Sequence, residues 1–271
     1  RGGKLLGGDI ALQAADVDNR DGVVQAQGTL AVASVGALRN QGGRVYGGVV
    51  GIDAGSLVNA AGKLASAGAL DLAISGRLDN TDGSLLAQGR ATLGAADIFN
   101  ERGHVAADRL ALDILGDLRN QDGSVYGGVA DIRAAGVDNA RGKILGAGEL
   151  TLNAGGKIDN AGGTFAAEGV ALLRAQEVAN ANGLMAASDL TLQTQGVLDN
   201  RAGRIQGDDA LVLRAGRVDN RDTLGGGIAI AGADATDTDA ANPDPLPGRL
   251  GLAGARIALV TDAVDNLCGR I

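Results

Sequence analysis

Six aspartates, each followed directly by an asparagine, are the residues of this chain best suited to chemistry. They are Asp18, Asp79, Asp138, Asp159, Asp199 and Asp219. Carboxylates gathered on one face could act as acid and base on a polysaccharide, which is the enzymatic interpretation of the sequence. However, these acids recur at regular positions with Arg39 and Arg119 among them, whereas a catalytic cluster would break the repeat at one place. We therefore favour a solvated charged rim and expect no catalytic residue.

The single histidine and the single cysteine offer little further chemistry. His104 follows Gly103 in a column that elsewhere holds Arg44 and Lys63, so we expect it to face solvent. A metal site needs several ligands, and the sequence has no second histidine. Cys268 cannot form a disulfide within the chain, and we predict an incidental buried thiol. We expect neither a metal nor a cofactor.

One acidic stretch, at about residues 231–248, interrupts the pattern of the chain. It contains all three prolines, and because proline cannot donate to a strand ladder, the stretch predicts a loop extruded from the fold. Its aspartates are Asp234, Asp237, Asp239 and Asp244. They could attract Ca²⁺, but the EF-hand spacing is absent. We favour an acidic loop without a ligand and keep these aspartates as a candidate interaction loop.

The strongest pattern is Asn-x-x-Gly, which recurs about every 20 residues. The asparagines are Asn19, Asn40, Asn59, Asn80, Asn100, Asn120, Asn139, Asn160, Asn180, Asn200 and Asn220. All but the last have a glycine three positions on, namely Gly22, Gly43, Gly62, Gly83, Gly103, Gly123, Gly142, Gly163, Gly183 and Gly203. A fixed short period indicates a solenoid, in which each unit contacts only its neighbours. We interpret the glycines as turn residues that tolerate positive φ.

Two structural roles are open for the asparagine column. An apolar residue stands two positions before each asparagine, as Val218 does before Asn220. Because side chains two apart in a strand share a face, the amides should point inward and could hydrogen-bond from coil to coil as an asparagine ladder. The alternative is an outward asparagine that holds a left-handed turn. We favour the ladder.

Further apolar columns accompany the asparagines at spacing two. Pairs such as Leu110 and Leu112, or Leu190 and Leu192, lie midway between successive asparagines. Spacing two is typical of a half-buried strand, and no segment has the stripe of an amphipathic helix. Each unit therefore predicts three short strands separated by tight turns.

A unit of this size cannot bury its own apolar side, so identical units must stack. Because parallel crossovers are right-handed in nearly all cases, we predict an all-β, right-handed parallel β-helix. About thirteen coils would form a rod on the order of 60 Å long. We expect regular coils over residues 1–220 and continuing coils over 221–271, interrupted by the loop. A segment around Tyr46 reappears around Tyr126, which indicates duplication of a four-coil block.

Charge and hydropathy argue against nucleic acid as a partner and against a membrane-spanning segment. The net charge is −8, which disfavours nucleic acid because its binding needs clustered lysine and arginine. No apolar run approaches the roughly 18 residues of a membrane span. The chain opens with Arg1-Gly2-Gly3 in the middle of a repeat, so we expect it to be a segment of something larger.

The unit seen at Leu78–Leu93 and again at Leu198–Leu213 resembles the filamentous haemagglutinin repeat. The resemblance extends from Gly3 to about Asn220 and returns at Val264–Gly269. It implies a non-enzymatic shaft of a large exoprotein that Gram-negative bacteria secrete by the two-partner route. Filamentous haemagglutinin adhesins and the stalks of contact-dependent growth inhibition toxins share this repeat.

The resemblance also implies partners and a location. The partners would be an outer-membrane transporter during secretion and a host or target-cell receptor or glycan afterwards. The protein would be secreted to the cell surface. Two rival hypotheses remain: a polysaccharide-acting β-helix enzyme, and direct binding of glycans or receptors by the shaft.

Overall fold

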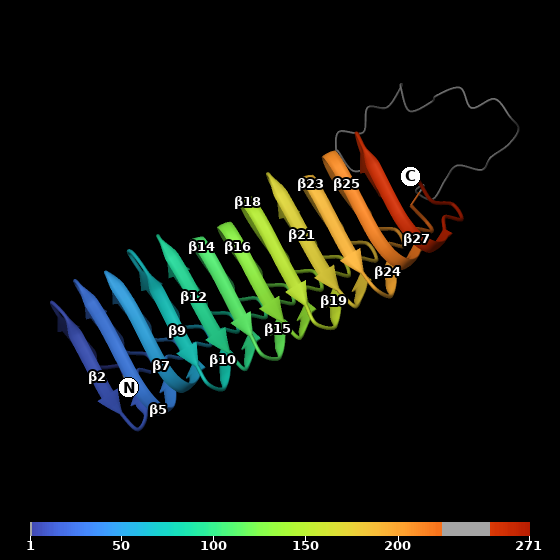
Figure 1. The fold of residues 1–271 in the computed structure, drawn as a ribbon. Helices are drawn as coiled ribbons and strands as arrows, with labels where there is room; N and C mark the ends of the chain where they lie inside the picture. Colours follow the sequence, from blue (N-terminus) through green and yellow to red (C-terminus); the bar gives the residue numbers. More distant parts are fainter. Residues whose placement is uncertain (1, 224–249) are drawn as a thin grey trace, which may run out of the picture.

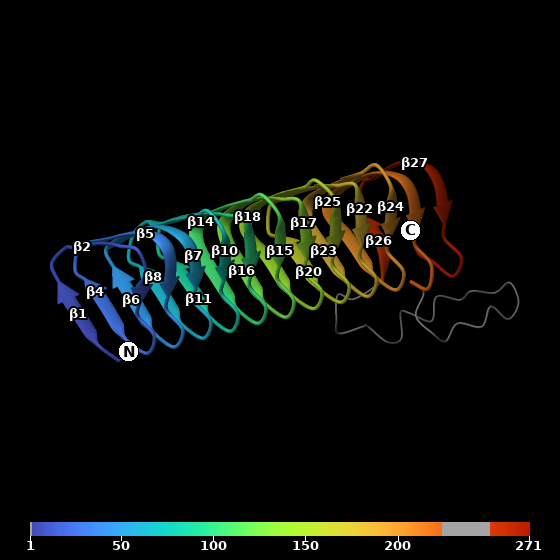
Figure 2. The same ribbon diagram turned by 90° about the horizontal axis from the view of Figure 1, so that it is seen from below.

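The computed structural model describes residues 2–223 and 250–271, which form an elongated rod of stacked coils (Figures 1 and 2). The described residues form a β-solenoid of about 11 turns with parallel strands, coils of about 20 residues and no helix. The prediction of an all-β solenoid is therefore confirmed. About thirteen coils are predicted for the whole chain, and about 11 turns are seen in residues 2–223 and 250–271, because residues 224–249 lie outside the described part.

Each coil contributes one strand, or part of a longer strand, to each of three rows of parallel strands that run along the rod. We call these rows sheet 1, sheet 2 and sheet 3. Sheet 1 contains β1 (Lys4–Gly7), β4 (Val23–Ala26), β6 (Arg44–Gly47), β8 (Lys63–Ser66), β11 (Ser84–Ala87), β20 (Thr164–Ala167) and β26 (Gly251–Gly254). Sheet 2 contains β2 (Ile10–Ala14), β9 (Leu70–Ile74), β12 (Arg90–Ala95) and β21 (Val170–Ala175). Sheet 3 contains β3 (Val17–Asp18), β10 (Arg77–Asp79), β13 (Asp97–Phe99), β15 (Asp117–Arg119), β17 (Gly136–Asp138), β19 (Lys157–Asp159), β22 (Glu177–Ala179) and β24 (Val197–Asp199).

Longer strands bend from one sheet into the next. β14 (His104–Ile114), β16 (Ser124–Ala134), β18 (Lys143–Ala154) and β23 (Leu184–Thr194) join sheets 1 and 2. β5 (Thr29–Arg39), β7 (Val49–Val58) and β27 (Ile257–Asp265) join sheets 2 and 3, and β25 (Arg204–Asp219) runs through all three. The three strands expected for each coil are thus present, although some are continuous around a corner.

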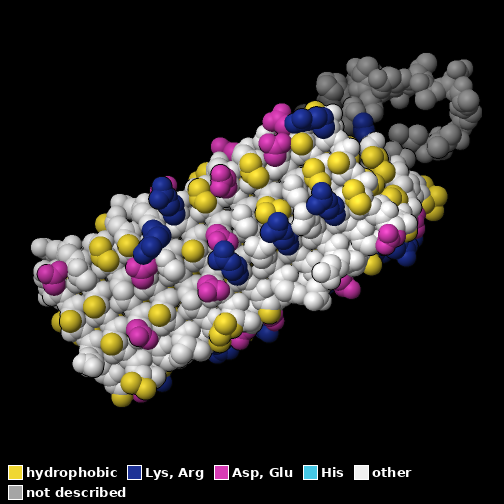
Figure 3. Space-filling model, viewed as in Figure 1, with side chains coloured by type: hydrophobic (Ala, Val, Ile, Leu, Met, Phe, Trp, Pro, Cys, Tyr) yellow, Lys and Arg dark blue, Asp and Glu magenta, His cyan; other side chains and the backbone are white. Residues whose placement is uncertain are grey.

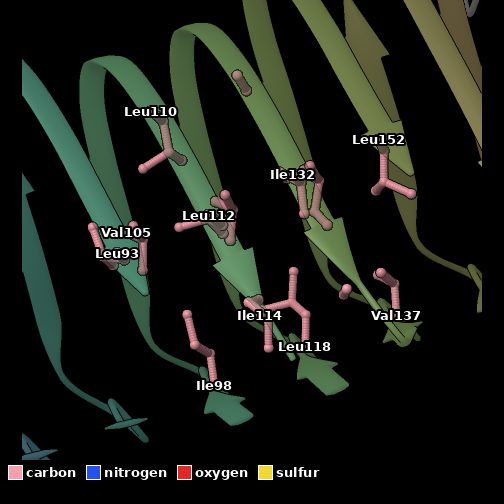
Figure 4. Close-up of a cluster of buried hydrophobic side chains, with 14 of the residues drawn as sticks. Leu93, Ile98, Val105, Leu110, Leu112, Ile114, Leu118, Ile132, Val137 and Leu152 are labelled. Atoms are coloured by element: carbon pink, nitrogen blue, oxygen red, sulfur yellow. The ribbon is translucent and has the colours of Figure 1, made fainter. Parts of the chain in front are cut away.

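The register keeps each type of residue on its own kind. Leu93 pairs with Leu112, Leu112 with Ile132 and Ile132 with Leu152, all in parallel strands of sheet 2. These four side chains are almost completely buried, and Figure 4 shows them directed into the rod beside residues of the other sheets. Because the period within each strand is two, every second side chain enters this core and the others face solvent.

The stacking resumes after the undescribed segment. β26 and β27 pair in parallel with β25, and Val218 of β25 lies opposite Val264 of β27. The extruded loop predicted at residues 231–248 lies outside the described residues. The outer surface over sheet 2 mixes basic, acidic and apolar side chains (Figure 3).

Candidate functional site

The asparagine column forms a continuous file of buried amides. The Nδ2 atom of each asparagine donates to the Oδ1 atom of the asparagine one coil further on. This distance is 2.7 Å from Asn19 to Asn40 and from Asn120 to Asn139. The file continues from Asn200 to Asn220 at 2.8 Å and on to Asn266 at 2.7 Å. All donors point the same way, so each amide between Asn19 and Asn266 both donates and accepts within this asparagine ladder.

The second hydrogen of each Nδ2 group is donated to backbone carbonyl oxygens. Asn120 Nδ2 lies 3.4 Å from the Gly123 carbonyl of its own turn and 3.1 Å from the Lys143 carbonyl of the next coil. Asn19 is 7% exposed, and the asparagines from Asn40 to Asn220 are 0% exposed. Burial of an unpaired amide costs about 1–3 kcal/mol, so this complete pairing explains how the core contains a polar column. The outward alternative for these asparagines does not occur.

The glycine column is required by close packing between coils. An ideal Cβ on Gly163 would lie 2.1 Å from the Asn139 carbonyl oxygen of the preceding coil and 2.6 Å from Asn160 Oδ1. Comparable clashes arise from Gly43 to Gly203. A methyl group there would separate the two coils at the ladder, which only glycine avoids.

Positive φ falls one residue before the glycine column, contrary to the sequence-based interpretation of the turn. The residues with positive φ include Asp122 at 55°, Arg141 at 57° and Gly162 at 63°. The glycines that follow them do not have positive φ. The turn therefore places other residue types in the left-handed region, and the regularly spaced glycine is needed because the preceding coil lies too close for a side chain. Sequence spacing alone could not separate these two reasons for a glycine.

The aspartates that precede the asparagines form a rim of turn-capping and ion-paired groups. The backbone N–H groups of Thr81, Ala140 and Ala161 donate to Asp79, Asp138 and Asp159, each at 3.1 Å. Asp18, Asp199 and Asp219 each pair with an arginine two positions on, at 2.5–2.6 Å. Asp159 pairs with Lys157 at 2.7 Å. These carboxylates therefore have structural partners at successive positions of the repeat.

Arginine partners favour the ionised form of two of these carboxyl groups. The side-chain hydrogen bond from Arg201 lowers the pKa of Asp199 below its ordinary value of 3.8, and Arg221 lowers the pKa of Asp219 in the same way. Pairs also form between coils: Arg102 lies 2.8 Å from Asp82, and Arg141 lies 2.8 Å from Asp122. A carboxyl group with a depressed pKa is a poor general acid near neutral pH.

The remaining sequence candidates do not converge on one place. His104 is exposed, as its column predicted. Cys268 is also exposed, so the prediction of a buried thiol was wrong. It lies in the turn that follows Asn266, the last asparagine of the ladder, and no described coil covers this turn. Among the described residues, no cluster of His, Cys, Asp and Glu could hold a metal. Asp234, Asp237, Asp239 and Asp244 lie outside the described residues.

Sequence reasoning missed one surface feature on sheet 3. Phe99 lies between two guanidinium groups, with Arg77 at 4.9 Å and Arg119 at 4.4 Å from its ring centroid. An open hollow of about 610 Å³ adjoins it and is lined by Asp117, Arg119, Asp138 and Lys157, among others. Placing the sequence in 20-residue columns puts Arg119 in the column of Phe99, whereas Arg77 falls in the column of Asp97, so the columns alone indicate only half of this stack.

The register, the core and the ladder together define a β-solenoid shaft. A family model described as the haemagglutinin repeat matches residues 1–82, 65–122, 127–178 and 166–242. The chain therefore belongs to the haemagglutinin repeat family, as a shaft-like segment of a filamentous haemagglutinin-type protein. The search of curated proteins and the search of solved structures each find no match. The described part of the chain contains no helix that is long and apolar enough to cross a membrane.

Proposed function

We propose that this chain is a stiff, non-enzymatic spacer in a secreted exoprotein of a Gram-negative bacterium. It holds an adhesive or toxic element away from the producing cell, after passage through an outer-membrane transporter. The transporter and the final receptor or glycan on the opposing cell belong to this proposal, and so does the cell-surface location. Family membership supports it, because proteins with this repeat are typically secreted or displayed at the surface.

The observation that carries the proposal is the continuity of the asparagine ladder. It links Asn19 to Asn266 through a hydrogen bond at every coil boundary. Each boundary also has parallel backbone pairing in three sheets. Bending the rod would stretch these bonds on one side and compress the packed core on the other, so the geometry resists curvature. A spacer needs this stiffness.

A deletion of four complete coils tests the spacer role in the intact exoprotein. Removing residues 80–159 joins Asp79 to Asn160 and preserves the order of strands and the ladder. Reach should fall by about 19 Å, since each coil contributes about 4.8 Å. We expect secretion and display to persist, while binding to or intoxication of a target cell is reduced in proportion to the lost length.

Restoring the deleted length with an unrelated β-solenoid segment provides the control. If the deletion abolishes activity and equal length does not rescue it, residues 80–159 have a role beyond spacing and the proposal fails. A second deletion, of residues 80–169, removes an additional half coil. It should prevent folding, because the remaining half coil would face the wrong sheet.

A further inference from the structure

The outer surface of sheet 1 carries cations and apolar groups but no acid. Two outward columns run along it, one in register from Lys4 to Gly251 and one from Leu6 to Ala253. At the described register positions the first includes Lys4, Arg44, Lys63, Lys143 and Arg204, and neither includes Asp or Glu. We call this surface the basic face. It stands out because acids outnumber bases by 32 to 24 in the whole sequence.

The basic face is available for contact. Lys4, Arg44, Lys63 and Lys143 are exposed and form no ion pair with any described residue. The second column places larger apolar groups beside them, including Tyr46, Leu86, Tyr126 and Leu145, and Tyr126 is 40% exposed. In the turns that precede sheet 1, Arg102 pairs with Asp82 and Arg141 pairs with Asp122, whereas Asp21 in the equivalent position forms no ion pair with a described residue.

On sheet 3 the acids outnumber the bases, which include Lys157 and Arg217. Its outward columns contain Asp79, Asp97, Asp117, Asp138 and Glu177, which form no ion pair with any described residue. Two of its arginines, Arg77 and Arg119, lie against the ring of Phe99. We call this surface the acidic face. Figure 2 shows the strands of sheet 1 and sheet 3 running along the same rod, so both faces extend along its length.

We propose that the basic face of one rod docks on the acidic face of a second copy of this chain. Both faces are built from short parallel strands that repeat at about 4.8 Å, so cations and carboxylates can stay within reach over many coils. The complementary charges steer the encounter, and Tyr46, Leu86, Tyr126 and Leu145 provide area that is covered on contact. Because the two faces differ, each rod can engage two neighbours, and the rods assemble side by side without closing.

The size of the faces indicates weak, reversible association. Sheet 1 strands of four residues span about 13 Å, and 11 coils span about 50 Å, so a paired contact covers roughly 1,200 Å² in total. This value is at the lower limit for stable complexes between proteins. Exposed charges are screened at high ionic strength, so the association should depend on salt.

Sedimentation analysis of charge-reversed variants tests the proposal. Lys63→Glu with Lys143→Glu alters the basic face, and Asp117→Lys with Glu177→Lys alters the acidic face. The matched control is Arg174→Glu with Arg214→Glu, which changes the net charge by the same amount as the basic-face variant but on sheet 2. Circular dichroism establishes that each variant is folded. We expect the parent and the control to associate at about 50 mM salt and to dissociate at about 500 mM salt.

The mixed sample gives the decisive result. Each face variant alone should associate at least about tenfold more weakly than the parent, whereas an equimolar mixture of the two should associate again, because their faces are complementary. The proposal is overturned if the parent stays monomeric at low salt, if the sheet 2 control weakens association equally, or if the mixture does not recover. A monomeric parent that co-sediments with phosphatidylglycerol vesicles would also overturn it and would assign the basic face to an anionic membrane.

Discussion

Two adjacent glycines in one turn separate the two physical reasons for a glycine column. Gly162 has a φ of 63°, and an added Cβ would have only Arg141 Cγ within 4 Å, at 3.7 Å. Gly163 lacks positive φ, but its Cβ would lie 2.1 Å from the Asn139 carbonyl oxygen. Alanine substitution at each position should therefore destabilise the rod for a different reason and by a different amount.

The expected magnitudes follow from these contacts. Gly162→Ala incurs about 1 kcal/mol of left-handed strain, which the lower entropy of the unfolded chain partly offsets. Ala61 and Ala202 already occupy the equivalent position in other coils. Gly163→Ala must move the Asn139 carbonyl by about 1 Å, which disrupts the 2.7 Å bond from Asn139 to Asn160 and the bond from Asn160 to Asn180. At about 1–3 kcal/mol for each buried bond, we expect a loss of about 2–5 kcal/mol.

Urea unfolding followed by circular dichroism measures both variants against the parent. We expect the midpoint of Gly163→Ala to fall clearly and that of Gly162→Ala to change little, with similar m-values. The reverse order would refute the packing explanation and restore positive φ as the reason for the column. Equal midpoints for all three proteins would mean that the coils separate at the ladder without cost.

Three further predictions concern the ladder, the core and the charged rim. Asn120→Ala should lower the free energy of unfolding by about 1–3 kcal/mol in urea titrations, and Asn120→Asp should lower it further near pH 7 because it buries a charge; a parent-like midpoint for both would contradict the ladder. Leu112→Ala should cost about 2–5 kcal/mol in the same assay, because its side chain is 1% exposed between Leu93 and Ile132, whereas Ala111→Ser, on the outer face of the same strand, should change little. Because the pKa values of Asp199 and Asp219 are depressed in the folded state, their ionised carboxylates stabilise the fold at pH values above the ordinary pKa of about 3.8. This stabilisation is lost as the pH falls through the pKa values of the folded state. Thermal midpoints should therefore be level from about pH 7 to 5 and decline below about pH 4. Arg201→Gln should reduce that decline, and an unchanged acid profile would show that the ion pair contributes nothing.

The repeat made much of this fold predictable. The interval between asparagines gave the coil length, and the spacing of Leu110 and Leu112 gave strands with one buried face. The shared parity of Val218 and Asn220 indicated an inward amide, which is where the structure has it. These inferences succeeded because stacking forces equivalent residues into equivalent environments, so that each column samples the same position many times.

Features that depend on contacts between particular coils could not be read from the period alone. The role of Gly163 depends on its distance to Asn139, which the spacing does not contain. The exposure of Cys268 depends on what covers the last turn. The stacking of Phe99 depends on two side chains that reach it from the coils on either side, Arg77 and Arg119.

The central claim is that this chain is a rod whose length is set by its number of coils. Small-angle X-ray scattering of the parent and of the variant lacking residues 80–159 tests it most directly. The account predicts an elongated particle in both cases, with the same cross-section and a maximum dimension about 19 Å shorter in the variant. A compact parent, or a variant whose cross-section changes while its length does not, would contradict it.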